Sequence, residues 1–440
     1  MDRRIAALAL PALGALIVEP LFLAVDAAMI GHLGAPPLAG LAIASAILQT
    51  AVGLMVFLAY ATTPLVARRR ASGDLRGAVQ AGIDGLWLAL GIGIVVGLVL
   101  WVLSSPLVAA FPADRAVADQ ALTYLTISCL GVPAMLMVFA ASGLLRGMQD
   151  TRTPLTVAAV GFTANALLNW WFIYGLGWGL AGSAWGTVAA QWGMVLVYAL
   201  VVGRHARRHG AGVLPHRDGL SRAGRSGGWL FIRTLGLRIA LLATVFAATS
   251  HGVLTVAAYQ IVFTMFGIAA FALDALAIAA QALIGDALGA RDAARARLVM
   301  RRTVFWGLLS GAVIGLVVAI ASPALGRVFT SDRDVLAILP VGLVILGLSL
   351  PLGAVVFVLD GVLMGAGDAR YLAWTSLVNL GCYMPALWAL STAAGGTGAE
   401  ADGAAVAALT AGFTVVFMAA RALTLGWRAR GDRWVTLGVV

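Results

Sequence analysis

Long apolar runs separated by short polar segments fill this 440-residue sequence from one end to the other. A helix needs about 20 predominantly apolar residues to cross a bilayer, and twelve of the runs are long enough. With boundaries accurate to about four residues, the predicted membrane helices are 6–31, 36–66, 78–104, 117–146, 153–175, 180–203, 229–250, 254–285, 298–321, 334–363, 370–392 and 404–427. The pattern therefore predicts an all-α membrane protein with twelve transmembrane helices.

The polar segments between these runs return in the second half of the chain at a constant spacing of 218 positions. The loop LRGMQDTR at 145–152 comes back as LMGAGDAR at 363–370. Residue pairs with this offset are Gly147 and Gly365, Asp150 and Asp368, Arg152 and Arg370, Gly34 and Gly252, and Asp74 and Asp292. Each half holds six predicted helices, so both copies enter the membrane in the same orientation, related by an axis along its normal.

This repeat predicts the organisation of the chain. We expect an N-terminal six-helix lobe over residues 1–203, a cytoplasmic linker over 204–228 and a C-terminal six-helix lobe over 229–440. Internal repeats of this kind are common in transporters, where the substrate site lies between the repeats and opens to each side in turn. The pattern therefore favours two pseudo-symmetric lobes around a central cavity and transport by alternating access.

The composition supports a membrane location, and the charge distribution indicates orientation. Hydrophobic residues make up 61% of the chain and charged residues 11%, against about 45–50% and 25% in soluble domains. The net charge is +10, and the basic residues, all arginine, cluster around 68–76, 146–152, 204–225, 291–302 and 428–433. Because cytoplasmic loops carry the excess of basic residues, both termini are expected in the cytoplasm. The charge thus reads as a topology signal, not as a nucleic-acid-binding surface.

Several kinds of chemistry lack the residues that they need. The two cysteines, Cys129 and Cys382, lie in apolar runs and predict neither a disulfide framework nor a metal site. The five histidines lie in or near loops without metal-ligand spacing. The chain has no lysine, so a P-loop with its usual lysine is excluded. We therefore expect a protein that is not an enzyme and carries no cofactor or metal, and we expect no drive by ATP within this chain.

Acidic residues inside the apolar runs are the candidates for function. A charged side chain at the bilayer centre costs about 2.5–3.5 kcal/mol on insertion scales, so it is rarely present without a role. Asp26 is the strongest candidate, because the position 218 residues later is Thr244 and the acid is therefore absent from the second copy. A carboxyl group at this depth could exchange a proton and couple substrate movement to a proton gradient. Alternatively, Asp26 only accepts hydrogen bonds from neighbouring helices and fixes packing.

Two prolines and a second acid accompany Asp26 in the first predicted helix. Glu19 lies seven residues before Asp26 and so nearly on the same face, which makes it a candidate for the substrate cavity. Pro11 and Pro20 each remove a helical hydrogen bond, and we expect this helix to bend there. The alternative is a static kink of the sort common in membrane helices.

Polar uncharged residues could complete a cage around Asp26. Asn165 and Asn169 lie one turn apart in the fifth predicted helix and share a face, and Thr187 lies in the sixth. Their other reading is ordinary hydrogen bonding between helices, worth about 0.6–2 kcal/mol each.

The second half offers its own candidates for a substrate cavity. Asp274 and Gln281 lie two turns apart in the eighth predicted helix, and Asp360 lies late in the tenth. These acids could bind a cationic substrate group, or Asp360 could simply pair with Arg370 or Arg302.

Two more charged residues, Asp84 and Arg238, lie inside predicted helices. We expect Asp84 to be a surface or capping residue. For Arg238 we expect a side chain that reaches towards the cytoplasmic side.

The residues resemble the MATE family, the multidrug and toxic compound extrusion transporters, and in particular its DinF-type branch. The stretches that carry the resemblance are EPLFLAVDAAMIGHLG at 19–34, GLLRGMQDTR at 143–152, FIRTL at 231–235, 274–285 ending in QALIG, and LDG at 359–361. The resemblance extends over essentially the whole chain and implies two six-helix lobes facing a central cavity, with exchange of H⁺ or Na⁺.

The resemblance also assigns residues. Asp26 matches the first-helix acid of the family's N-terminal cation site, Pro11 the proline at which that helix bends in some members, and Asn165 and Thr187 polar partners in the site. Asn169 stands where many members carry a second acid. A single carboxylate weakens a cage for a hard cation such as Na⁺, so the departure favours H⁺ as the coupling ion.

The sequence thus predicts an antiporter of a bacterial inner membrane. It would act as a monomer among membrane lipids and export lipophilic, cationic organic compounds in exchange for protons. Two alternatives stay open: a Na⁺-coupled exporter, and a flippase for lipid-linked precursors, which would need an internal row of basic residues. A membrane enzyme is disfavoured by the scattered histidines.

Overall fold

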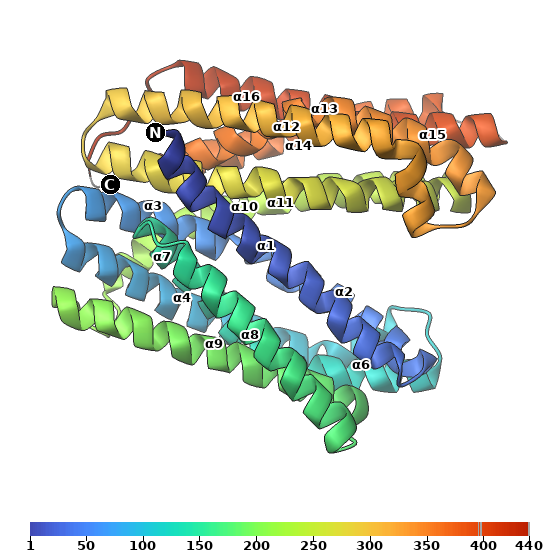
Figure 1. Ribbon diagram of the computed structural model, residues 1–440, viewed down its shortest axis with the longest axis horizontal. Coiled ribbons are helices and arrows are strands. Elements are labelled where there is room, and N and C mark those ends of the chain that lie inside the picture. Colours follow the sequence, from blue (N-terminus) through green and yellow to red (C-terminus); the bar gives the residue numbers. More distant parts are fainter. Residues whose placement is uncertain (395, 397, 439–440) are drawn as a thin grey trace. The chain divides into compact units, whose positions relative to one another are not determined.

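The computed structural model describes residues 1–394, 396 and 398–438, apart from the side chains of Glu19 and Ala399. This part of the chain contains helices and turns and no strand, as the apolar pattern predicted. The elements are α1 (Asp2–Gly31), α2 (Ala35–Leu54), α3 (Phe57–Ala71), α4 (Leu75–Val102), α5 (Ser104–Ala109), α6 (Arg115–Ser128), η1 (Cys129–Gly131), α7 (Val132–Gly147), α8 (Arg152–Trp170), η2 (Trp171–Gly175), α9 (Gly179–His209), α10 (Arg217–Thr249), α11 (Val253–Gly289), α12 (Ala293–Phe329), α13 (Arg333–Gly365), α14 (Ala369–Ala393), α15 (Ala399–Ala411), η3 (Gly412–Phe417) and α16 (Met418–Arg430) (Figure 1).

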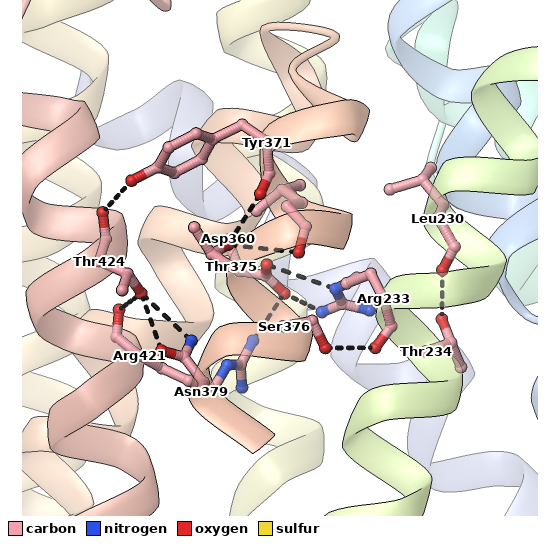
Figure 2. A network of polar contacts seen from close by, with 11 residues as sticks. Leu230, Arg233, Thr234, Asp360, Tyr371, Thr375, Ser376, Asn379, Arg421 and Thr424 are labelled. Atoms are coloured by element: carbon pink, nitrogen blue, oxygen red, sulfur yellow. Dashed lines mark hydrogen bonds and ion pairs between the residues drawn. The ribbon is translucent and has the colours of Figure 1, made fainter. Parts of the chain in front are cut away.

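Eleven helices among the described residues are long and apolar enough to cross a membrane. Four of them are composite: α2 with α3, α6 with η1 and α7, α8 with η2, and α15 with η3 and α16. The predicted helix 370–392 forms α14, which is long enough but is not among the eleven. Its polar residues Thr375, Ser376 and Asn379 lower its hydropathy, and they belong to the polar network that Figure 2 shows.

The chain divides into two compact units. Residues Leu10–Gly227 form one, here called the N-terminal unit, and Met1–Ala9 with Gly228–Gly438 form the other, the C-terminal unit. One boundary lies inside α1 and the other inside α10. The stretch 204–228, which the sequence predicted to be a linker, is largely helical. Helix α9 continues to His209, and α10 begins at Arg217.

Each unit contains the same close helix crossing, at positions 218 apart. In the N-terminal unit, a Cβ atom added to Gly143 of α7 would lie 2.5 Å from the backbone oxygen of Ala59 in α3. In the C-terminal unit, one added to Gly361 of α13 would lie 2.4 Å from the backbone oxygen of Ala277 in α11. One turn later, Gly147 meets Thr63 and Gly365 meets Gln281 in the same way. Small residues allow such approach where no hydrophobic force drives helices together, so the repeat extends from loops to packing.

Helix starts repeat as well. Gly34 and Gly252, with φ of 116° and 107°, precede α2 and α11. Asp74 and Asp292 cap α4 and α12 by accepting a hydrogen bond from the backbone N–H three residues on, at 2.7 and 2.8 Å. A glycine tolerates positive φ and an aspartate is a favoured N-cap, which explains why these residues stood out in the sequence.

Candidate functional site

Asp26, on α1, is buried in the N-terminal unit with 3% of its surface exposed. Its Oδ1 accepts two hydrogen bonds, from Nδ2 of Asn169 on α8 and from Oγ of Ser183 on α9, each 2.8 Å long. Both donors are neutral. Asp26 therefore joins α1 to two other helices, and it forms no ion pair with the residues that the structure describes.

The packing of α8 against α9 places these donors. The two helices follow one another in the chain and run antiparallel (Figure 1). Asn165 and Asn169 lie one turn apart on α8, and Ser183 and Thr187 lie one turn apart on α9. Asn165 Nδ2 donates to Thr187 Oγ1 at 3.0 Å, while Asn169 Nδ2 lies 3.5 Å from Ser183 Oγ. Two polar pairs thus lie one turn apart between α8 and α9: Asn165 with Thr187, and Asn169 with Ser183. We call these four residues the ladder, and its Asn169–Ser183 pair contacts Asp26.

Glycines on α9 bring the two helices close at this ladder. A Cβ atom added to Gly186 would lie 2.0 Å from Asn169 Oδ1, and one added to Gly182 would lie 2.8 Å from the backbone of Phe172. Neither position can hold a side chain without moving its neighbour. Gly186 thus fixes where the Asn169 amide lies, and through it the donor to Asp26.

Two site residues were not singled out in the sequence. Ser183 lies one turn before Thr187, so pairing Asn165 and Asn169 with an antiparallel α9 would have predicted it. Tyr124 of α6, 5% exposed, lies near the hydroxyls of Ser183 and Thr187 and interacts electrostatically with Asp26. No sequence spacing indicates Tyr124, because α6 lies far from α1 along the chain.

The site contains unused hydrogen-bond acceptors. Oδ1 of Asn165 and Oδ1 of Asn169 are both buried and have no hydrogen-bond partner among the described residues. A buried amide oxygen without a partner is costly, so each is suited to accept a proton-bearing group or to bind a small cation. The carboxylate, two amide oxygens and neighbouring hydroxyls form a cluster rich in oxygen.

Asp360, on α13 of the C-terminal unit, has a different environment, although it is also 3% exposed. Arg233 of α10 pairs with it through Nη2 and Oδ2, with Nε 3.4 Å from Oδ1. Arg421 of α16 places Nη2 3.2 Å from Oδ2. Figure 2 shows both guanidinium groups pointing to this carboxylate. An ion pair was an open alternative for Asp360, but the partners are not Arg370 or Arg302; Arg370 instead lies over the Trp229 ring, 5.9 Å from its centroid.

The remaining substrate-cavity candidates are Asp274 and Gln281 in the C-terminal unit and Glu19 on α1. Asp274 is half-buried on α11, and Gln281 is 1% exposed. Pro11 and Pro20 lie inside a continuous α1, so bending at them stays a prediction. Glu19 belongs to the same helix, but its side chain lies outside the described residues.

Asp84 is a buried capping residue, not a surface one. It is 3% exposed and accepts hydrogen bonds from Gln80 Nε2 at 3.1 Å and from the backbone N–H of His216 at 2.9 Å. His216 immediately precedes α10, so Asp84 of α4 caps the start of a distant helix. Arg238 is exposed on α10.

The model of the MatE family matches residues 11–171 and 233–388 of this chain. The chain belongs to the MatE family. Protein DETOXIFICATION 44, chloroplastic, of Arabidopsis thaliana is 30% identical over 389 residues, which cover 85% of this chain and 74% of that protein. DNA damage-inducible protein F of Escherichia coli strain K12 is 27% identical over 383 residues, covering 84% and 81%. The predicted family is thus confirmed.

Solved structures show the same fold. The Vibrio cholerae MATE transporter VcmN in its bent form superposes with a TM-score of 0.85 at 24% identity, covering 98% of each chain. The two-lobe architecture of MatE transporters is therefore present here, and the chain is a multi-pass membrane transporter of the multidrug and toxic-compound efflux type. The matched ranges contain Asp26, Asn165 and Asn169 but neither Ser183 nor Arg421.

Proposed function

We propose that this MatE transporter exports lipophilic, cationic organic compounds in exchange for protons, with Asp26 as the group that binds the proton. The supporting observation is the environment of Asp26: a buried carboxylate held by two neutral donors, beside amide oxygens that have no partner. An ionisable group at membrane depth without a fixed counter-charge is suited to change its protonation state during transport.

Both protonation states of Asp26 can be satisfied in this site. When ionised, Asp26 accepts hydrogen bonds from Asn169 and Ser183. When protonated, it becomes a donor itself, and Asn169 Oδ1 or the lone pairs of Ser183 Oγ can accept. A change of protonation therefore reorganises the bonds that tie α1 to α8 and α9, and the protonated carboxyl could donate to Asn169 Oδ1, which has no partner among the described residues when Asp26 is ionised.

Reorganised bonds at Asp26 would act on a helix that is able to deform. Pro11 and Pro20 weaken the hydrogen-bond ladder of α1 on the side preceding Asp26. Proton binding and substrate binding would then favour different shapes of α1. Each proton that moves inward across 100 mV contributes about 2.3 kcal/mol, enough for roughly fifty-fold accumulation of substrate.

Sodium is the second candidate for the coupling ion. The unpartnered oxygens of Asn165 and Asn169 favour it, because a hard cation binds carboxylate, amide and hydroxyl oxygens together. The single carboxylate favours the proton as the coupling ion, because Asn169 contributes an oxygen atom but no second negative charge. A flippase for lipid-linked precursors is less well supported, because the partly buried Arg233 and the buried Arg421 share Asp360.

The arginine-rich loops support a location in a bacterial inner membrane with both termini in the cytoplasm. We propose that the monomer is the transporting unit.

Ethidium efflux from everted vesicles, driven by a pH gradient or by a Na⁺ gradient alone, tests the proposal. We expect efflux under the pH gradient for the wild type and background efflux for Asp26→Asn. Asp119→Asn serves as the matched control, since Asp119 is an exposed acid on α6. Proton-driven transport that persists in Asp26→Asn would refute the role of Asp26, and wild-type efflux that requires Na⁺ would change the ion.

A further inference from the structure

The segment 204–225, in which α9 ends and α10 begins, carries a concentration of exposed positive charge. Its six arginines are all exposed: Arg204, Arg207, Arg208, Arg217, Arg222 and Arg225. None of them forms an ion pair with a residue that the structure describes. The segment contains a single acid, Asp218, which is also exposed. The charge of these arginines is therefore available to a partner from outside the chain.

Small buried residues turn the arginines outward. On the first turns of α10, Gly219 and Gly227 are buried and lie two turns apart. A Cβ atom added to Gly219 would overlap the carboxylate of Asp84 on α4, and one added to Gly227 would lie 2.8 Å from the ring of Phe57 on α3. The last turns of α9 bury Ala206 in the same way, with 1% of its surface exposed. Each helix end thus packs on one face and presents arginines on the other.

Side chains of α4 fix the loop between these two helix ends. Gln80 and Trp87 lie on the same face of α4 as Asp84, at spacings of four and three residues. Gln80 Nε2 donates to the backbone oxygen of Leu214 at 2.9 Å, and Trp87 Nε1 donates to that of Val213 at 2.9 Å. Together with the cap that Asp84 provides, these bonds hold the loop backbone against the N-terminal unit.

The fixed loop presents two apolar side chains. Val213 and Leu214 expose 68% and 69% of their surface. Trp87 indicates what covers them, because its indole is 42% exposed and donates its N–H to the loop. Indoles of this kind are enriched at the boundary between lipid chains and water. Since Trp87 contacts Val213, the apolar pair lies at that boundary.

We propose that the segment 204–225 binds anionic phospholipids of the bilayer around the protein. Val213 and Leu214 enter the interfacial layer beside Trp87, and the arginines bind the phosphates of the lipid headgroups. A guanidinium can hold a phosphate through two parallel hydrogen bonds. A soluble phosphate would engage the arginines but leave two apolar side chains in water, so a lipid fits both features. This surface is separate from Asp26 and does not depend on which ion drives transport.

The depth of the loop in a bilayer tests the apolar part of this surface. In full-length protein in liposomes, Cys129 and Cys382 are replaced by alanine and a nitroxide label is attached at Leu214→Cys. Ser72→Cys, in the exposed turn between α3 and α4, is the matched control. We expect the label at 214 to collide more often with oxygen than with a water-soluble nickel chelate, and the label at 72 to show the reverse. Equal access to the chelate at both positions would overturn the proposal.

The affinity for lipid headgroups tests the arginines. In detergent, short-chain phosphatidylglycerol should raise the unfolding midpoint of the wild type more than phosphatidylcholine of the same chain length does, because a ligand of the folded state stabilises it. Near an anionic surface each basic residue contributes about fivefold in affinity. Three substitutions should therefore raise the half-saturating concentration of phosphatidylglycerol by about a hundredfold. The variant combines Arg207→Gln, Arg208→Gln and Arg222→Gln.

A second triple variant removes the same charge elsewhere. It combines three exposed arginines of the C-terminal unit: Arg301→Gln, Arg430→Gln and Arg433→Gln. This control should keep the half-saturating concentration within a few-fold of the wild type. An equal loss in both variants would mean that only net charge matters and would overturn the surface. Glycerol 3-phosphate, which has no acyl chains, should not reproduce the midpoint shift; if it did, the segment would be a site for soluble phosphate instead of lipid.

Discussion

Asp26 and Asp360 are equally buried, yet their partners differ in charge. Asp26 accepts from an amide and a hydroxyl, whereas Asp360 contacts two guanidinium groups. Protonation of Asp26 replaces hydrogen bonds from neutral donors to a carboxylate by hydrogen bonds of a neutral acid. Protonation of Asp360 would remove the negative charge that the buried Arg421 and the partly buried Arg233 share. Depth in the membrane therefore does not by itself assign a role to an acid; the charge of the groups around it does.

The repeat sharpens this comparison, because each acid has an uncharged image in the other unit. Thr244, the image of Asp26, lies 2.6 Å from the hydroxyl of Tyr383, which is itself the image of Asn165. Ser142, the image of Asp360, lies 3.2 Å from the hydroxyl of Tyr198. Two hydroxyl pairs thus replace the two acids, while the glycine crossings around them are kept. The lobes share a scaffold and differ in their charged sites.

The largest expected effect separates the two acids by function. Asp26→Asn should reduce proton-driven ethidium efflux to background, because the group that carries the proton is gone. Ethidium efflux by Asp360→Asn should still depend on the pH gradient, even if less of this variant folds. Vesicles matched for transporter content provide the measurement. Equal loss of pH dependence in both variants would erase the distinction.

Stability should show the opposite order. Asp360→Asn removes the negative charge that the buried Arg421 and the partly buried Arg233 share, and should cost about 3–5 kcal/mol. Asp26→Asn keeps a hydrogen-bonding group of the same shape and should cost about 0.5–1.5 kcal/mol. Unfolding midpoints measured in the same buffer compare the two variants. A larger loss for Asp26→Asn would contradict the assignment of Asp360 as the structural acid.

Crowding the ladder should affect the Asp26 site alone. Gly186→Ala places a methyl group on the Asn169 amide and should cost about 1–3 kcal/mol as the buried hydrogen bond is lost, with a matching fall in efflux. Gly193→Ala on the same helix meets no atom within 4 Å and should leave both unchanged. Efflux rates and unfolding midpoints measured on the same preparations test the pair.

The smallest effect is expected from a single donor. Ser183→Ala removes one of two hydrogen bonds to Asp26 and should cost about 0.5–1.5 kcal/mol, which corresponds to roughly two- to tenfold in efflux rate. Thr163→Ala, an exposed hydroxyl on α8, is the control. If Ser183→Ala and Thr163→Ala behave alike in the efflux assay, Ser183 has no part in the site.

Much of the fold could be read from the chain because its signals are local. The length of an apolar run indicates a membrane helix. Residues such as Gly34 and Asp74, which particular turns and caps require, indicate the repeated loops. Asp26 stood out for the same reason, since an acid in an apolar run needs no structure to be noticed. Asn165 and Asn169 were placed on one face by their spacing alone.

Contacts between helices were decided only by the tertiary structure. Ser183, Tyr124, Arg233 and Arg421 join sites through packing between segments far apart in sequence, and Asp84 caps a helix whose start lies more than 130 residues away. Apolar periodicity tells where a helix runs but not how it is rotated against its neighbours. That rotation, set by close approaches such as that of Gly186 to Asn169, determines which polar groups meet, and hence why one buried acid has neutral partners and the other has charged ones.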